Sequence, residues 1–213
     1  CANTRCCRCN RRFSSKKSLV PPIRLMEIIA FILSLACVLL NAYGKILTWP
    51  LAIASSTAYA YVFFDSRLFG DAALQFVFIG LAIYAWITWH KKDTNHLANQ
   101  PSFSRASINS ITKCGIAWLL MFFVIQYILK NHTSSDVPNI DAFLTAGSLL
   151  ATYMSAQKWL ENWVLWAFVD VIYIGLYVYK DLYLTALLYG LLIGLCLLGW
   201  RQWSKQMKVK TNT

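Results

Sequence analysis

Charged residues are scarce in this 213-residue sequence, at 14% of the chain against a hydrophobic content of 58%. A soluble domain needs about 25% charged residues to cover its surface, so the composition excludes an ordinary soluble protein. The mean hydropathy is +0.48, and the charges lie between long apolar runs. This pattern is typical of a helical membrane protein.

Motifs for common catalytic chemistry are also missing. The sequence has no glycine-rich phosphate loop, no H-E-x-x-H and no G-x-S-x-G. Its three histidines, His90, His96 and His132, fall in expected loops. No segment resembles a nucleotide-binding site, so this chain by itself is no ATP-driven pump. We therefore expect a membrane protein that is no enzyme and needs no cofactor.

The net charge of +11 does not indicate nucleic-acid binding, because most lysines and arginines lie in the tails and in one loop. There they orient the chain and meet anionic headgroups of the lipid bilayer. Counting every basic residue, the two sides of the membrane tie. Without the N-terminal tail, the long loop and the C-terminal RQWSKQMKVK place the C-terminus in the cytoplasm and the N-terminus outside.

The seven cysteines form two groups. Three are isolated in or beside apolar runs and are interpreted as small core residues: Cys37, Cys114 and Cys196. The other four crowd the N-terminus in CANTRCCRC: Cys1, Cys6, Cys7 and Cys9. A zinc site favours two separated pairs with C-x2-C spacing, which this cluster lacks. We expect a basic tail over 1–24 and no metal site.

Seven segments approach the roughly 20 residues that a helix needs to cross a bilayer. They cover 25–43, 46–64, 68–89, 113–130, 141–157, 162–179 and 182–203. The fifth is rich in Thr, Ser and Ala, which suits packing against other helices better than exposure to lipid. We expect one membrane domain over 25–203, followed by a second basic tail over 204–213.

An internal repeat appears when the sequence is shifted by 114 residues, which lays 46–89 over 160–203. Tryptophan, tyrosine and glycine pairs then coincide in one register: Trp49/Trp163, Tyr59/Tyr173, Gly80/Gly194, Trp86/Trp200 and Trp89/Trp203. Each copy holds three spans and one further span lies between them, so both copies enter the membrane in the same sense. The sequence predicts two parallel three-helix repeats, 25–89 and 141–203, joined by a linker helix over 113–130.

The span 162–179 carries a carboxylate within an apolar run. Trp163, Trp166 and Asp170 are spaced three and four apart and share one helical face, which Tyr173 and Tyr177 continue. A mid-span charge costs at least ~2.5 kcal/mol on insertion scales, and indole faces attract cations. This stripe is a plausible site for a flat organic cation.

Structural alternatives remain for the same residues. Asp170 could instead pair with Lys158 or a nearby tyrosine, and Trp163 could be an interfacial belt residue. The belt also accounts for the tryptophans that flank basic ends: Trp86, Trp89, Trp200 and Trp203. The lysines of the short links, Lys45, Lys158 and Lys180, are interpreted as solvated anchors.

Other polar groups lie at comparable depth in other spans. Gln75 follows Asp71 by one turn, and Tyr189 occupies the equivalent position in the second repeat. Both could hydrogen-bond a ligand, or Gln75 could join helices at ~0.6 kcal/mol. Trp49, the counterpart of Trp163, precedes Pro50 and could simply mark a helix start.

The stretch KWLENWVLWAFVD and the span that ends LLGWRQW resemble the PnuC family of bacterial vitamin transporters, with its WxxWxxxN/D motif. LQFVFIGLAIYAWITW is similar to the third span of that family. The resemblance covers about 25–203. The chain departs from it by carrying Asp170 where many members have Asn, and by its Cys/Arg-rich N-terminus.

The resemblance implies a full-length SWEET-like fold, often a homotrimer, in the bacterial inner membrane. It implies facilitated diffusion of an unphosphorylated vitamin that a cytosolic kinase then traps. Matched by motif, Trp163, Trp166 and Asp170 would bind substrate. Gln75 and Tyr189 would assist, and Trp49 would be a gate or wall residue. Tyr173 and Tyr177 are gate candidates.

Nicotinamide riboside fits the acidic, indole-lined stripe because it is a flat pyridinium cation with a ribose. Thiamine is also cationic, whereas riboflavin is neutral and larger. We expect nicotinamide riboside, with thiamine or riboflavin as alternatives. A sugar carrier of the same architecture and a non-transporting receptor or scaffold stay open. In the sugar carrier a neutral ligand would make Asp170 dispensable.

Overall fold

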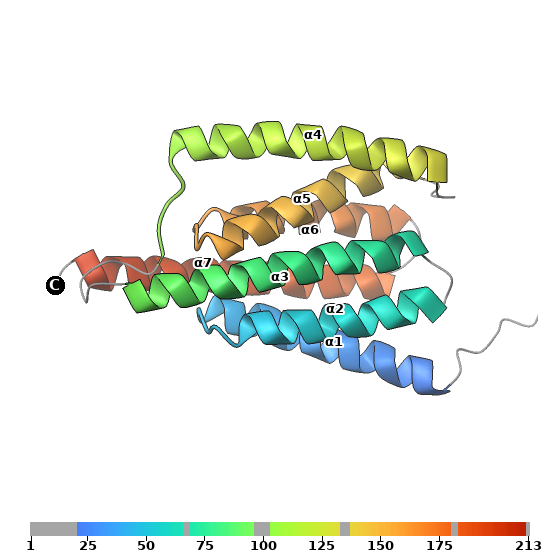
Figure 1. Cartoon of the computed structure of the whole chain (residues 1–213), viewed down its shortest axis with the longest axis horizontal. Helices are drawn as coiled ribbons and strands as arrows, with labels where there is room; N and C mark the ends of the chain where they lie inside the picture. The colour runs from blue at the N-terminus through green and yellow to red at the C-terminus, as the bar shows by residue number, and fades with distance from the viewer. Residues whose placement is uncertain (1–20, 66–68, 96–102, 133–136, 180–182, 212–213) are drawn as a thin grey trace, which may run out of the picture.

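The computed structural model describes residues 21–65, 69–95, 103–132, 137–179 and 183–211, and this part of the chain forms seven α-helices (Figure 1). Their bounds are α1 Pro21–Ala42, α2 Thr48–Asp65, α3 Phe69–Asn95, α4 Ile108–His132, α5 Pro138–Ala156, α6 Asn162–Tyr179 and α7 Tyr183–Thr211. Each predicted span corresponds to one helix. The N-terminal cysteine cluster, His96 and Lys180 lie outside the described residues.

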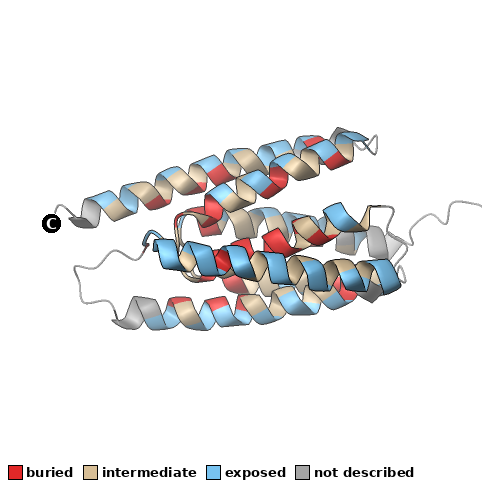
Figure 2. Ribbon diagram, turned by 90° about the horizontal axis from the view of Figure 1, so that it is seen from above, coloured by how far each residue is buried: buried red, intermediate tan, exposed pale blue. Residues whose placement is uncertain are grey.

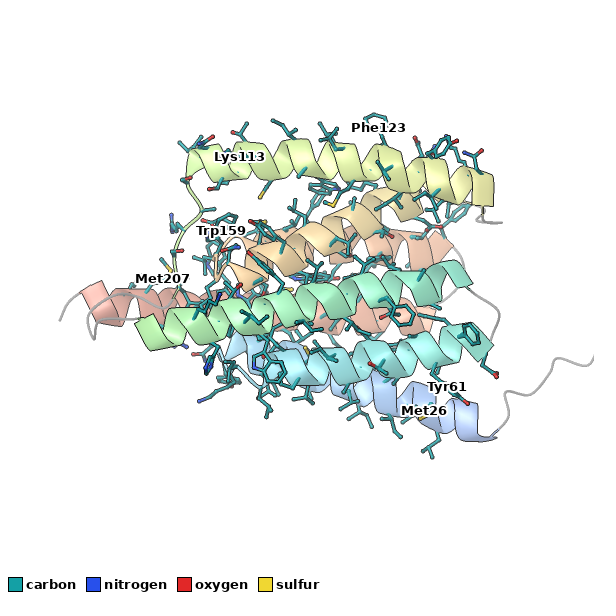
Figure 3. All side chains as sticks on the ribbon, viewed as in Figure 1. Met26, Tyr61, Lys113, Phe123, Trp159 and Met207 are labelled. Carbon is teal, nitrogen blue, oxygen red and sulfur yellow. The ribbon has the colours of Figure 1, made fainter. Side chains whose placement is uncertain are left out.

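Length and composition suit the helices to a membrane. Three contain stretches that could cross one: Ala72–Lys91, Ile108–Asn131 and Asn162–Tyr179; α1 has a shorter apolar stretch, Ile28–Ala42. Exposed residues cover the outer faces of the helices, and buried residues lie between the helices (Figure 2). Large apolar side chains point outward from several helices, Phe123 of α4 among them (Figure 3).

Helix boundaries follow local chemistry. Proline occupies the first turn of α5 at Pro138, where its missing N–H costs no hydrogen bond. Ser107 accepts a hydrogen bond at its Oγ from the backbone N–H of Ser110 (3.2 Å) at the start of α4. The segment predicted as a basic tail, 204–213, continues α7, which ends at Thr211. Lysine and glutamine are good helix formers, so the helix outlasts its apolar part.

Six helices contact one another in a closed ring. The contacting pairs are α1 with α2, α2 with α3, α3 with α5, α5 with α6, α6 with α7, and α7 with α1. The pattern is unchanged when α1, α2 and α3 are exchanged with α5, α6 and α7. Within the described part, the backbone of α4 lies close to α5, the ring of Trp118 also meets Phe168 of α6 (6.2 Å between centroids), and α4 lies at the edge of the molecule (Figure 1).

The small residues of α5 place it inside the protein. Eleven of its residues are buried, including Ala146, Gly147, Ser148 and Ala151. A Cβ at Gly147 would lie 2.8 Å from Val169 Cγ2, so glycine permits the close approach of α6. The expectation that this span packs against helices is confirmed.

The links before α2 and α6 contain the same backbone hydrogen bonds 114 residues apart. Gly44 N donates to Asn41 O (2.9 Å), and Lys158 N donates to Ser155 O (2.9 Å). The next bond in each link joins Lys45 N to Leu40 O (3.0 Å) and Trp159 N to Met154 O (3.1 Å). The offset equals the spacing of the sequence repeat.

Both links also use one left-handed residue at the same place. Gly44 has φ of 67° and Lys158 has φ of 60°. Glycine adopts this conformation freely, whereas lysine does so at a cost. The prediction that Lys158 is a solvated anchor is wrong: it is 2% exposed, and its Nζ lies 4.7 Å from the ring centroid of Trp89.

The segment before α4 is fastened to the second link. Ser104 N donates to Lys158 O (3.1 Å), and Leu160 N donates to Ser104 O (3.0 Å). Ala106 N donates to the carboxylate of Glu161 (2.9 Å). The long connection between α3 and α4 therefore joins the rest of the molecule at the end where α7 finishes.

Candidate functional site

The helix α6 presents three faces with different surroundings. Val169 and Leu176 pack toward α5 in one apolar cluster with Leu144. Val164 and Val171 are exposed on the outer surface. The remaining face carries Trp163, Trp166, Asp170, Tyr173 and Tyr177, which lie along the helix at intervals of three and four residues. The predicted stripe is therefore distinct from both the packing face and the outer face.

Asp170 is 3% exposed and has a thiol as its neighbour. Cys196 of α7 donates from Sγ to Asp170 Oδ2 at 3.9 Å, and thiols are weak donors. The alternative pairing with Lys158 is wrong, because that ammonium lies over Trp89 instead. A buried carboxylate with a single weak partner retains capacity for a stronger donor or a cation.

Trp163 and Trp49 are buried in equivalent environments. Trp163 meets Trp203 edge-on (5.3 Å between centroids, 80°), and Trp49 meets Trp89 in the same way (5.3 Å, 84°). The ring of Trp163 lies directly over Gly199, where an added Cβ would approach Cε2 to 2.4 Å. One face of this indole is therefore covered by α7.

Trp89 and Trp203 are wholly buried, so the prediction that they form an interfacial belt is wrong. Trp89 Nε1 donates to Ser155 O (3.1 Å), and Trp203 Nε1 donates to Asn41 O (3.0 Å). The two indoles lie 6.1 Å apart. We call Trp49, Trp89, Trp163 and Trp203 the tryptophan quartet, and it belongs to one buried apolar cluster.

Four buried polar atoms near the quartet have no hydrogen-bond partner within the described part of the chain. They are Thr48 Oγ1, Trp49 Nε1, Asn162 Oδ1 and Trp163 Nε1. Thr48 and Asn162 are 114 residues apart, as are Trp49 and Trp163. Unsatisfied polar atoms therefore occur at equivalent positions in both halves. Unsatisfied buried groups are costly unless they meet a ligand or water.

A tyrosine cluster lies farther along the stripe. Tyr173 and Tyr177 stack on each other (5.8 Å, 15°), and Tyr189 of α7 lies 4.8 Å from Tyr173 and 5.2 Å from Tyr177. Three predicted site residues thus come together. In α2, Tyr59 and Phe63 stack in the same way (5.8 Å, 19°).

Gln75 and Trp166 lie at the margin of these clusters. Trp166 is half-buried and packs against the apolar core that contains the tryptophan quartet. Gln75 is half-buried on α3, a helix that α6 does not contact directly. Among the described residues, no hydrogen bond or ring contact joins Gln75 to the α6 stripe.

Sequence reasoning missed two features of this region. Cys196 was interpreted as a core residue, and its place opposite Asp170 depends on how α6 packs on α7. Asn41 Nδ2 donates to Ser155 Oγ (3.0 Å) between the halves. Those two residues are 114 apart, so extending the repeat five residues upstream of 46 would have paired them.

Comparison with known proteins relates the whole membrane domain to transporters. A family model described as nicotinamide mononucleotide transporter matches residues 24–205. The nicotinamide riboside transporter PnuC of Escherichia coli (strain K12) is 22% identical over 201 residues, covering 84% of each chain. The riboflavin/roseoflavin transporter RibM of Streptomyces davaonensis is 24% identical over 178 residues, covering 83% of each.

A solved structure shares the fold. The crystal structure of the vitamin B3 transporter PnuC matches with a TM-score of 0.70 at 20% identity, covering 89% of this chain and 85% of that one. The likeness, together with the apolar helices, confirms the prediction of an all-helical integral membrane protein.

Proposed function

The chain belongs to the nicotinamide mononucleotide transporter family, and from this premise we propose that it carries nicotinamide riboside into the cell by facilitated diffusion. Members of the family are multi-pass membrane transporters and not enzymes. The relative PnuC of Escherichia coli is named for nicotinamide riboside. Phosphorylation by a cytosolic kinase would trap the vitamin after entry.

The observation that carries the proposal is the buried carboxylate of Asp170 beside an indole stripe. Its weak thiol partner leaves it able to accept from ribose hydroxyls or to offset the pyridinium charge. Trp166, one turn earlier on the same face, offers a ring for cation–π contact. Trp163, two turns before Asp170 on the same helix, has an indole N–H without a partner among the described residues, as does Trp49 on α2.

An unphosphorylated substrate suits this site better than the mononucleotide in the family's description. A phosphate adds negative charge and would be repelled by Asp170 at short range. The cationic side chain buried among the described residues, Lys158, lies over Trp89 in the tryptophan quartet. The charge on the stripe therefore favours a cation.

Alternating access would come from two parallel three-helix repeats, α1–α3 and α5–α7, that rock about the site. Three features support this arrangement: the exchangeable ring of helix contacts, the matching link hydrogen bonds and the paired Trp–Trp contacts. The tryptophan quartet is one gate. Tyr173 and Tyr177 form the other, next to the substrate-binding candidate Tyr189, whose equivalent position in the first repeat is Gln75.

Uptake by purified protein in liposomes tests the proposal. A monovalent cation gains about 2.3 kcal/mol per 100 mV, so a negative interior of 100 mV should accumulate labelled nicotinamide riboside about 50-fold. Binding without flux would indicate a receptor. Uptake that ignores the imposed potential would contradict the uncoupled transport of a cation.

Riboflavin is the second candidate because the relative RibM is named for it. Riboflavin is neutral, so the membrane potential would not concentrate it and Asp170 would add little to its binding. Competition between the two vitamins in the same liposomes separates these candidates. Thiamine, which is cationic, belongs in the same assay.

A further inference from the structure

A groove of about 650 Å³ lies between α3, α4 and α5, away from the α6 stripe. It lies where α4 packs on α5 and, within the described residues, the backbones of α4 and α3 do not come close together. The volume falls in the range that holds a drug-sized molecule. None of the residues assigned to substrate binding or gating lines it.

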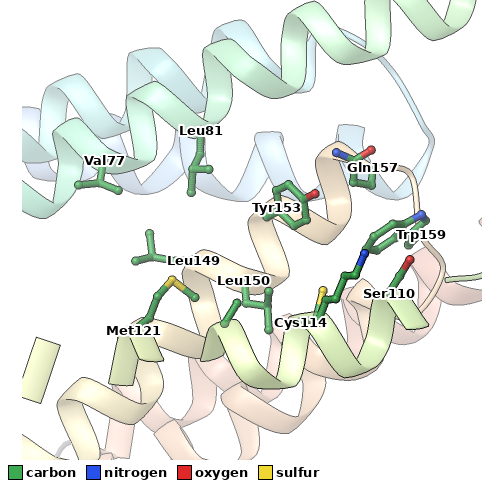
Figure 4. Close-up of a pocket in the computed structure, with 12 residues that line it drawn as sticks. Val77, Leu81, Ser110, Cys114, Met121, Leu149, Leu150, Tyr153, Gln157 and Trp159 are labelled. Carbon is green, nitrogen blue, oxygen red and sulfur yellow. The ribbon is translucent and has the colours of Figure 1, made fainter. Parts of the chain in front are cut away.

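The two ends of the groove differ in chemistry. Ser110, Gln157 and Trp159 lie at one end, and Val77, Met121 and Leu149 lie at the other (Figure 4). Lys113 follows Ser110 by one helical turn and is the charged side chain among the lining residues. The groove is thus polar and cationic at its mouth and apolar along its body.

Aromatic residues indicate the depth of the mouth in the membrane. Trp159 and Tyr153 lie edge to face at this end (6.1 Å, 87°), and amphipathic aromatic rings concentrate at membrane–water interfaces. Lysine side chains near helix ends extend toward the headgroups. Lys113 is exposed and lies near the start of α4, next to the connection from α3 (Figure 3).

We propose that this groove binds an anionic phospholipid, with one acyl chain between α3 and α4 and the phosphate at Lys113. An acyl chain would make dispersion contacts along the apolar walls of the groove. The lysine adds the preference for a negative headgroup. The lipid would occupy the space between α3 and α4.

Native mass spectrometry of the purified protein, with added phosphatidylglycerol or phosphatidylcholine, tests this assignment. The wild type should retain phosphatidylglycerol in preference to phosphatidylcholine. Lys113→Gln should lower retention of phosphatidylglycerol about fivefold and leave phosphatidylcholine unchanged. Lys205→Gln, on α7 outside the groove, is the matched control and should have no effect.

A second variant examines the apolar body. Ala117→Trp places a large ring in the groove and should reduce retention of both lipids. Thermal unfolding of each variant in detergent shows that the protein is intact. Equal retention of the two lipids by the wild type would overturn the proposal. Equal effects of Lys113→Gln and Lys205→Gln would also overturn it. So would an oligomer that retains no lipid and in which a second copy of the chain covers the groove.

Discussion

Asp170 combines an energetic cost with a chemical use. A carboxylate at mid-span costs at least ~2.5 kcal/mol on insertion scales, and a thiol at 3.9 Å compensates little of this. Side chains that keep such a cost are commonly those that bind or transport. The residue therefore links the stability of α6 to the proposed substrate site.

Asp170→Asn should raise the thermal stability of the ligand-free protein while it weakens the binding of nicotinamide riboside. The amide keeps the shape of the side chain and removes the buried charge, so the free energy of unfolding should rise by about 2.5 kcal/mol. Unfolding followed by intrinsic fluorescence measures the change. Asp65→Asn, at the exposed end of α2, should change neither property. Lower stability of Asp170→Asn would show that the carboxylate is structural.

At the scale of helices, the packing of α6 on α7 depends on one glycine. Trp163 occupies the space above Gly199 so closely that no Cβ fits there. The same helix contains Gly194, which has open space around its Cα. The two glycines separate an effect on packing from an effect on helix propensity.

Gly199→Ala should displace Trp163 and destabilise the protein by about 1–3 kcal/mol, the usual cost of overpacking. Gly194→Ala should leave stability unchanged or slightly higher, since alanine favours helix. Thermal unfolding and the fluorescence of the tryptophans measure both effects. Equal effects of the two substitutions would contradict the close contact.

The tryptophan quartet offers a test of equivalence between the halves. Trp89→Phe and Trp203→Phe each remove one donor to a backbone carbonyl, of Ser155 or Asn41. Each should cost about 0.5–1.5 kcal/mol, the net contribution of one hydrogen bond, because each carbonyl keeps a backbone donor, Lys158 N or Gly44 N. The two costs, read from thermal unfolding, should be similar. A large effect of one and none of the other would argue against equivalent halves.

Much of the architecture could be predicted from the sequence, because apolar runs long enough to span are bounded by polar links. The sequence repeat could be found because tryptophans recur in one register. The rotation of each helix about its own axis, which decides which side chains face inward, could not be predicted from the sequence. Trp89 and Trp203 flank basic ends like belt residues, yet their helices turn them inward. The burial of Lys158 was not predictable either, because it depends on the left-handed backbone of Lys158 itself, with which the ammonium lies over Trp89.

The candidate site was predicted in part. The stripe on α6 follows from helical spacing, and its tyrosines do meet Tyr189. The contact between Cys196 and Asp170 could not be predicted, since it joins two helices whose relative register no local pattern specifies. The ligand roles of these residues, and the homotrimer implied by the family resemblance, stay predictions.

At the scale of the whole molecule, the helix ring has two unlike ends. The tryptophan quartet lies at the end that carries Lys45, Arg105, Lys113 and Arg201, and the half-buried tyrosine cluster lies toward the other. With the N-terminal tail left out, basic residues are more frequent at the tryptophan end, which indicates the cytoplasmic side. We therefore propose that the tryptophan quartet faces the cytoplasm and that the tyrosine cluster faces the outside.

The central claim is that Asp170 and the indole stripe bind a flat cation. Calorimetric titration of nicotinamide riboside, thiamine and riboflavin into the wild type, Asp170→Ala and Trp166→Ala tests it most directly. The account predicts that the wild type binds nicotinamide riboside in preference to the others. Each substitution should weaken that binding at least about tenfold, the loss expected for a hydrogen bond to a charged group or a desolvated cation–π contact. Binding untouched by both substitutions, or no binding of any vitamin, would contradict it.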